Sequence, residues 1–404
     1  MNSSPLAPPS FPSLPPVEGV QLAVAASGMR YSGRDDLFLA FMSPGTMAGG
    51  VFTQSLCPSA PVDWCKKILN QQPARALLCN AGNANAFTGQ SGQEVVAESA
   101  KSVATLASVN LEEVFLASTG VIGEPFHPTV LTDHLPILIK GLKSPDSGLW
   151  KNAANAIRTT DTFPKGAYVE IGNTGAVVAG IAKGSGMIAP NMATMLAFVF
   201  TDMKVEQNFL QAATEIAVNQ SFNCITVDSD TSTSDTVLTF ATGKAEVSAE
   251  DNQLEFQEAL NTVMLRLAQQ IVRDGEGATK FVEISVTGAE DNSAAREIGK
   301  SVGNSPLVKT ALAAEDANWG RIVMGVGKSG QLAERDKLRI WIGDELVAER
   351  GMQAASYDES KATEHLCGQE ILIRIDVGVG DGNSSVWTCD LTHGYIDINA
   401  GYRS

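Results

Sequence analysis

Short hydrophobic runs and longer amphipathic stretches alternate along the chain. Apolar runs that end in Gly, Ser or Asp predict strands at 20–28, 36–43 and 51–57. Apolar positions three and four residues apart predict a helix over 91–107 and a long helix over 253–273. Strands and helices that follow one another in this way predict a mixed α/β (α+β) fold.

The region from Phe281 onward is more mixed, and we predict that residues 281–404 form a C-terminal subdomain. The motif GVGDG at 378–382 lies between two strand-like runs, so we interpret it as a hairpin turn and not as a dinucleotide-binding loop. A chain of 404 residues can form two domains or one large sandwich. Further helices are predicted near 129–142, 149–158, 206–219 and 294–302.

The N-terminal stretch, residues 1–17, has six prolines within its first sixteen residues. Such a composition is typical of an extended segment, and we predict a disordered leader. No basic residue precedes Arg30 and no apolar core region is present, so the stretch does not resemble a secretory signal. These features predict a cytoplasmic protein.

The composition excludes several classes of function. The formal net charge is -16, which disfavours binding to the phosphate backbone of a nucleic acid. Six widely spaced cysteines form no CxxC pair, and no apolar run is long enough to cross a membrane. Asp228, Asp230 and Ser232 begin like a calcium loop, but the glycine and the closing glutamate of that motif are absent. We therefore predict no metal site.

The stretch from Gly180 to Asp202 carries the strongest candidate for chemistry. Thr194 begins a buried strand after small Ala193 and a Pro-Asn turn, so a cut at this point would leave Thr194 as a new N-terminus. Its α-amine, with a reference pKa of about 7.7–8.0, could then take the proton of the threonine hydroxyl. None of the four histidines has a recognisable nucleophile setting. Spacing alone leaves open that Thr194 is an ordinary strand residue.

The exact residues of this segment are more informative about function than the spacing of its apolar positions. Residues 183–196, KGSGMIAPNMATML, closely resemble the autoprocessing segment of the ornithine acetyltransferase family, the glutamate N-acetyltransferases of arginine biosynthesis. The resemblance extends from about residue 18 to the end of the chain. It implies a layered sandwich of helices around stacked β-sheets, of the N-terminal-nucleophile type. It also implies self-cleavage into an alpha chain, 18–193 after the leader, and a beta chain, 194–404, which pair into a heterotetramer.

The resemblance also assigns roles to single residues. Thr119 and Gly120 match the oxyanion hole, which stabilises the negative charge that develops on a tetrahedral intermediate. Lys183 matches a ligand of the substrate carboxylate, and Glu276 matches a ligand of the substrate amino group. The matching substrate-binding positions are Thr160, with Thr162 as the alternative, Lys183, Thr194, Glu276, Asn399 and Ser404.

The implied reaction is the transfer of acetyl from N2-acetyl-L-ornithine to L-glutamate through an acetyl-threonine at Thr194. It needs no cofactor, although acetyl-CoA could serve as a second donor. Two other interpretations stay open. One is a self-processing aminopeptidase or amidase of the N-terminal-nucleophile type, which passes the acyl group to water. The other is a binding protein that remains one uncut chain of 42.5 kDa.

Overall fold

The computed structural model describes residues 3–71, 73–172, 174–189 and 195–401. Its larger part is built on an eight-stranded sheet in the order β4-β3-β2-β8-β7-β6-β5, with β1 paired to β2. The strands are β1 (Val20–Ala25), β2 (Leu37–Phe52), β3 (Ala74–Asn83), β4 (Val114–Val121), β5 (Lys165–Glu170), β6 (Val177–Lys183), β7 (Leu196–Thr201) and β8 (Thr236–Ala241).

The long strand β2 folds this sheet into two halves that face each other. Residues 37–42 pair with β1 and β3, whereas residues 47–52 pair with β8, and the pairing register shifts in between. Aromatic rings from the two halves meet, with Phe38 and Phe198 6.0 Å apart and Phe115 and Phe240 5.6 Å apart. The prediction of two strands at 36–43 and 51–57 was therefore wrong: one strand runs from Leu37 to Phe52, and residues 53–57 lie beyond its end.

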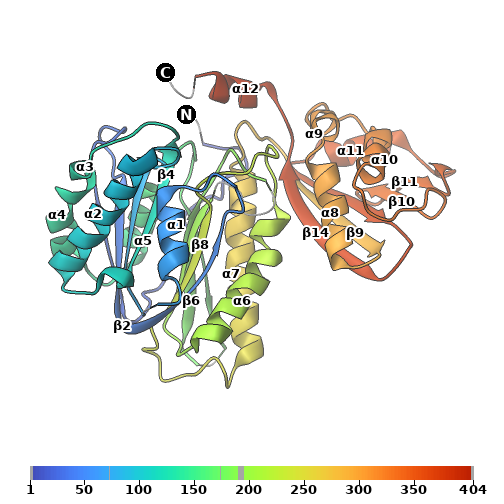
Figure 1. Ribbon diagram of the computed structural model, residues 1–404. Helices are drawn as coiled ribbons and strands as arrows, with labels where there is room; N and C mark the ends of the chain where they lie inside the picture. Colours follow the sequence, from blue (N-terminus) through green and yellow to red (C-terminus); the bar gives the residue numbers. More distant parts are fainter. Residues whose placement is uncertain (1–2, 72, 173, 190–194, 402–404) are drawn as a thin grey trace.

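Helices cover the outer faces of both halves (Figure 1). The half containing β1–β4 packs against α2 (Gly89–Ala107), α3 (Thr129–Thr132) and α4 (Leu135–Gly141). The half containing β5–β8 packs against α6 (Gln207–Asn219) and α7 (Gln253–Arg273). Between the halves lies an apolar core, to which α1 (Ala60–Ile68) and α5 (Ser147–Ala156) also contribute. The fold is thus a layered α/β sandwich with stacked sheets, as predicted.

The C-terminal region has its own sheet and its own hydrophobic core. Its strands lie in the order β12-β11-β10-β13-β9-β14. They are β9 (Phe281–Ala289), β10 (Arg339–Ile342), β11 (Glu345–Glu349), β12 (Met352–Gln353), β13 (Glu370–Asp376) and β14 (Gly382–Cys389). The helices are α8 (Asn292–Gly303), α9 (Pro306–Ala313), α10 (Trp319–Gly327) and α11 (Glu359–Leu366), and the last helix, α12 (His393–Ala400), returns to the sandwich.

The segment GVGDG at 378–382 is not the hairpin turn that the sequence predicted. Strands β13 and β14 pair with opposite sides of β9, so β9 lies between them. The connection therefore crosses the end of β9 to reach its other side. The prediction was wrong because short apolar runs around a glycine-rich turn do not reveal which strand lies between them.

Residues 3–17 pack against the sandwich and so differ from the disorder that the sequence predicted. Leu14 and Val17 belong to the inner core, at 2% and 1% exposure. The indole N–H of Trp150 donates to the carbonyl oxygen of Pro15 at 2.9 Å. The prolines keep the segment extended without leaving backbone N–H groups to satisfy, and the apolar residues between them fill gaps in the core.

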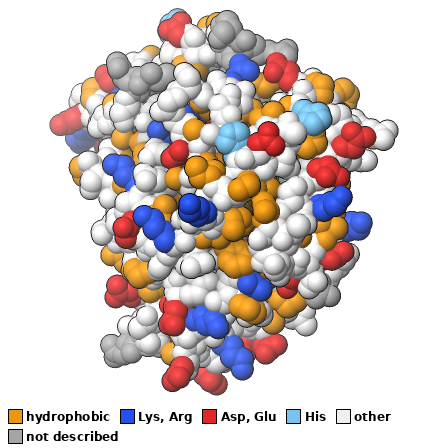
Figure 2. Space-filling model, turned by 90° about the vertical axis from the view of Figure 1, so that its left-hand side faces the viewer, with side chains coloured by type: hydrophobic (Ala, Val, Ile, Leu, Met, Phe, Trp, Pro, Cys, Tyr) orange, Lys and Arg blue, Asp and Glu red, His pale blue; other side chains and the backbone are white. Residues whose placement is uncertain are grey.

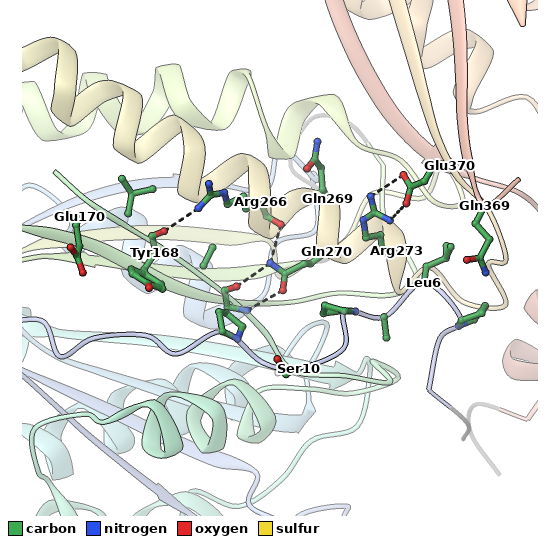
Figure 3. Close-up of a pocket in the computed structure, with 17 residues that line it drawn as sticks. Leu6, Ser10, Tyr168, Glu170, Arg266, Gln269, Gln270, Arg273, Gln369 and Glu370 are labelled. Carbon is green, nitrogen blue, oxygen red and sulfur yellow. Dashed lines mark hydrogen bonds and ion pairs between the residues drawn. The ribbon is translucent and has the colours of Figure 1, made fainter. Parts of the chain in front are cut away.

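The leader forms one wall of a groove of about 980 Å³ along β5 and α7 (Figure 3). Strand β5 is the edge of the sheet, and the Gln270 side chain bonds both the N–H and the carbonyl oxygen of Gly166 on it. Arg266 donates to the carbonyl oxygen of Tyr168, and Arg273 pairs with Glu370. The polar side chains of the groove thus cap the free edge of the sheet.

The outer face of the α2 and α4 layer carries hydrophobic side chains at its surface (Figure 2). Leu106 on α2 is 44% exposed and Ile137 on α4 is 64% exposed. Within the described ranges, none of the helices has the length and apolar character needed to cross a membrane.

Candidate active site

Strand ends from both halves of the sandwich meet at one end of the molecule. Lys183, the last residue of β6, pairs with Leu196 at the start of β7, and Leu196 pairs with Thr236 at the start of β8. In the other half, Thr119 and Gly120 near the end of β4 pair with the end of β3. A pocket of about 290 Å³ opens at this end.

The pocket draws its lining from segments that are far apart in the sequence. Six of the predicted site residues line it: Thr119, Gly120, Thr160, Lys183, Glu276 and Asn399. Ala193, Thr194 and Ser404 lie outside the described residues. Met195, the first described residue after the predicted cleavage position, donates its backbone N–H to Asp235 Oδ1 at 2.9 Å.

Only a glycine fits at position 120. Its φ is +133°, and a Cβ at this position would lie 2.3 Å from the carbonyl carbon of Gly82 on the neighbouring strand. The close approach of the two backbones therefore fixes the backbone near the end of β4. The Thr119 hydroxyl beside it lies 3.3 Å from Lys183 Nζ. A hydroxyl and a backbone N–H of fixed geometry can supply donors that are oriented before the reaction begins.

Lys183 places a buried cation in the pocket wall, with a side chain that is only 3% exposed. Its Nζ lies 2.9 Å from Thr159 Oγ1 and 4.0 Å from Asp161 Oδ2. Burial lowers the pKa of Lys183, and the negative charge of Asp161 opposes that change. The ammonium group can therefore offer a hydrogen-bonding charge to a substrate carboxylate.

A fully buried ion cluster lies behind Lys183. Lys165 Nζ is 2.7 Å from Asp161 Oδ1 and 2.6 Å from Asp274 Oδ2. Asp161 Oδ1 also accepts the backbone N–H of Gly184 at 2.6 Å. Burial by itself would raise the pKa of Asp161, but the charges of Lys165 and Lys183 outweigh it and hold that pKa well below its usual range. The cluster thus fixes the backbone that follows β6.

Glu276 places a carboxylate in the pocket beside the C-terminal helix α12. Asn399 Nδ2 on α12 donates to Glu276 Oε2 at 2.7 Å, and Thr160 also hydrogen-bonds the carboxylate. Burial raises the pKa of Glu276, and these two hydrogen bonds oppose the rise. Gly186 leaves room for it, because a Cβ there would lie 2.4 Å from Glu276 Cδ. The C-terminal tail therefore helps to build the pocket.

The structure separates the two alternatives for the substrate-contacting threonine. Thr160 lines the pocket. Thr162 instead points to the ion cluster, where its Oγ1 donates to Asp274 Oδ1 at 2.5 Å and accepts the backbone N–H of Ser4 at 2.9 Å. The geometry therefore favours Thr160 as the residue that a substrate would meet.

Several residues that shape the site were not predicted as site residues from the sequence. Thr159 bonds Lys183, and Asp161, Lys165 and Asp274 form the buried cluster. Tyr395 Oη lies 3.3 Å from Asp228 Oδ2, and both residues line the pocket. Asp161 and Lys165 are four residues apart, a spacing that could have drawn attention to them, but Asp274 lies more than a hundred positions away.

A layered α/β sandwich with a small polar pocket at its strand ends is typical of enzymes that act on small molecules. A model of the ArgJ family matches residues 21–404. Relatives called arginine biosynthesis bifunctional protein ArgJ include one from Ruegeria pomeroyi, 56% identical over 406 residues, covering 99% of this chain and 98% of the relative. Another, from Gluconobacter oxydans, is 53% identical over 408 residues, covering 99% and 95%.

The crystal structure of the arginine biosynthesis bifunctional protein ArgJ from Bacillus halodurans is 40% identical, with a TM-score of 0.49, and the match covers 51% of this chain and 98% of that one. The family model and the relatives of similar length show that this chain belongs to the ArgJ family. The family resemblance seen in residues 183–196 is confirmed.

Proposed function

We propose that this protein transfers acetyl from N2-acetyl-L-ornithine to L-glutamate in arginine biosynthesis. One observation carries the proposal: the 290 Å³ pocket holds a buried glutamate, Thr119 and Gly120 near the end of β4, and buried Lys183 at the end of β6, the strand that leads to Thr194. The curated relatives share the name of a bifunctional protein of arginine biosynthesis, which supports this assignment.

The reaction proceeds in two acyl transfers through Thr194. Its Oγ attacks the acetyl carbonyl carbon of N-acetylornithine, and its own α-amine takes the hydroxyl proton and returns it to the leaving nitrogen of ornithine. The amine of glutamate then attacks the acetyl-threonine ester by the reverse route. The Thr119 hydroxyl and the Gly120 N–H stabilise the oxyanion in both acyl transfers.

Both substrates carry an α-carboxylate, so one set of contacts can serve both. Lys183 binds this carboxylate, and Glu276 binds the amino group of the incoming or departing amino acid. Thr160, Asn399 and Ser404 complete the substrate contacts. Because one pocket binds the two amino acids in turn, the enzyme follows ping-pong kinetics.

Maturation is a cut between Ala193 and Thr194, after which the pieces 1–193 and 194–404 stay associated and pair into a heterotetramer. The exposed apolar side chains on the α2 and α4 face support an assembly of this kind (Figure 2). The proposed chemistry needs no metal, nucleotide or flavin. Acetyl-CoA is a possible second acetyl donor, and the compartment is the cytoplasm.

Denaturing intact-mass analysis after incubation with N-acetylornithine, without glutamate, tests the proposal. We expect two fragments that separate between Ala193 and Thr194, with one acetyl group on the fragment 194–404. The Thr194→Val variant should remain one chain of 42.5 kDa. Thr201→Val, at the other end of β7, is the matched control and should be cut normally.

An active protein that remains uncut would overturn the mechanism. Cut fragments without acetyl would instead indicate a hydrolase of the N-terminal-nucleophile type, which passes the acyl group to water. Addition of glutamate distinguishes the two activities, because it accelerates removal of the acetyl group only from a transferase.

A further inference from the structure

The proposed self-cleavage has a proton requirement that the mature enzyme does not have. Before the cut, the nitrogen of Thr194 is part of a peptide bond, so it cannot act as the base that activates the Thr194 hydroxyl. Another group must take the hydroxyl proton and deliver it to the nitrogen as the peptide bond breaks. The inference below rests on the proposed function.

Asp235 is bonded to Met195, the residue that follows Thr194 in the chain. It precedes β8 and is fully buried, at 0% exposure. Its Oδ1 accepts the backbone N–H of Met195 at 2.9 Å, and the N–H of Thr236 donates to the carbonyl oxygen of Met195 at 3.1 Å. Its own carbonyl oxygen accepts the N–H of Thr53 at 3.0 Å. These bonds hold the carboxyl group against Met195, whose neighbour in the sequence is Thr194.

The second oxygen of this carboxyl group, Oδ2, is buried and has no hydrogen-bond partner among the described residues. A buried polar atom without a partner is costly, and a catalytic role is one explanation for it. Two acids that line the pocket are engaged: Glu276 bonds Asn399 and Thr160, and Asp228 accepts the N–H groups of Met187 and Ile188.

We propose that Asp235 carries the proton during self-cleavage. As Thr194 Oγ adds to the carbonyl carbon of Ala193, its proton passes to Asp235 Oδ2. As the bond between that carbon and the Thr194 nitrogen breaks, Asp235 gives the proton to the nitrogen. The product is an ester between Ala193 and Thr194 Oγ. Water then hydrolyses the ester, which leaves a carboxyl group on Ala193 and restores the Thr194 hydroxyl.

The environment of Asp235 suits this role. Burial raises the pKa of its carboxyl group well above the usual value, while the N–H of Met195 and the charge of Lys183 oppose the rise. A group that must both take and return a proton works best when its pKa lies close to the operating pH. After the cut, the same oxygen can accept a hydrogen bond from the new α-amine.

The test follows cutting with time after cell-free synthesis of the full chain, by intact mass. Asp235→Asn should be cut at least about 10²-fold more slowly than the wild type, because a positioned acid or base contributes 10²–10⁴-fold. Asp202→Asn is the matched control: Asp202 follows β7, is buried and accepts the N–H of Val177 at 2.9 Å. It should be cut at the wild-type rate.

The asparagine variant also separates proton transfer from a purely structural role. Its side-chain oxygen can still accept the Met195 N–H, so a structural role predicts normal cutting and would overturn the inference. If wild type is not cut either, the proposed function fails instead, and the two failures are thereby distinguished.

A second variant keeps the test decisive if Asp235→Asn does not fold. In Asp235→Ala, formate can occupy the space of the lost carboxyl group and carry the proton, whereas formamide can only fill it. We expect formate to accelerate cutting and formamide, at the same concentration, to leave it slow. Equal effects of the two would overturn the inference.

Discussion

The sandwich and the C-terminal region differ in how deeply the side chains of their ion pairs are buried. Beside the pocket of the sandwich, the side chains of Lys165, Asp161 and Asp274 are all 0% exposed. From Arg296 onward, every ion pair between described residues has at least one partner whose side chain is 42% exposed or more. The two regions have similar elements, helices packed on a sheet, so the difference does not come from the fold class.

The buried cluster therefore calls for an explanation that the exposed pairs do not need. Moving ions out of water costs several kcal/mol per ion, and apolar residues of similar volume are often at least as stable. The cluster fixes backbone that the pocket needs, because Asp161 holds Gly184 and lies 4.0 Å from Lys183. The sandwich thus accepts a cost in stability at the place where the chemistry requires fixed charges.

The largest effect is expected when one ion is removed from each region, which tests the difference between buried and exposed ion pairs. Lys165→Met leaves Asp161 and Asp274 buried without their cation and should lower the free energy of unfolding by about 3–5 kcal/mol. Lys337→Met, in the C-terminal region, breaks an exposed pair with Glu334 and should have no measurable effect. Urea unfolding of both variants measures the difference, and equal midpoints would contradict the contrast.

A second test concerns geometry instead of charge. Gly120→Ala places a Cβ against Gly82 and should shift the donor at the end of β4, so that kcat falls by about 10²–10³-fold. Gly123→Ala is the matched control, because Gly123 also has a positive φ but has no atom within 4 Å of its Cβ position. It should cost about 1–2 kcal/mol of stability with little change in kcat. Similar kcat values for the two variants would show that backbone strain alone is responsible.

Local hydrophobic patterns predict most individual helices and strands of this chain, but not which strands pair with one another. The helices at 91–107 and 253–273 are found within about two residues, because their apolar stripes are local in sequence. Strand β2 was divided because its first apolar run ends at Ser43, in the middle of the strand. Its continuity comes from pairing with β8, almost two hundred residues away, which no local pattern encodes.

The same limit applies to the pocket. Six residues that the family resemblance named line one pocket, whereas the residues that support them were found only in the structure. Asp274 meets Lys165 across 109 positions, and Leu14 of the leader enters the inner core. Asp235 stands in a Ser/Thr-rich loop, and its bond to Met195 and its unpartnered Oδ2 are seen only in the structure. Thr194 and Ser404 stay predictions.

A third test uses the pH dependence of glutamate binding, which depends on two buried charged groups of the sandwich. Burial raises the pKa of Glu276 above 4.5 and lowers the pKa of Lys183 below 10.5. Glutamate binding needs Glu276 ionised and Lys183 protonated, so KM for glutamate should rise as pH falls through the raised pKa and as pH rises through the lowered one. Beyond each limit we expect roughly a tenfold change per pH unit.

The range of tight glutamate binding should therefore be narrower than 4.5–10.5 on both sides. The measurement is KM against pH in initial-rate assays, since kcat also reports the Thr194 amine. Glu276→Gln should abolish the acidic limb and leave the alkaline limb in place. If KM instead began to rise at the ordinary pKa values of 4.5 and 10.5, the substrate would not contact these two buried groups.

The smallest expected effect distinguishes two neighbouring threonines. Thr160→Val removes a hydroxyl that lines the pocket and bonds Glu276, and should raise KM by roughly 2- to 13-fold, as the loss of one hydrogen bond of 0.5–1.5 kcal/mol implies. Thr162→Val removes a bond to Asp274 in the buried cluster and should cost about 1 kcal/mol of stability with KM unchanged. Initial-rate kinetics and urea unfolding of both variants make the comparison. If Thr162→Val raised KM while Thr160→Val did not, the substrate would extend toward the ion cluster, and charge in the sandwich would act on it directly.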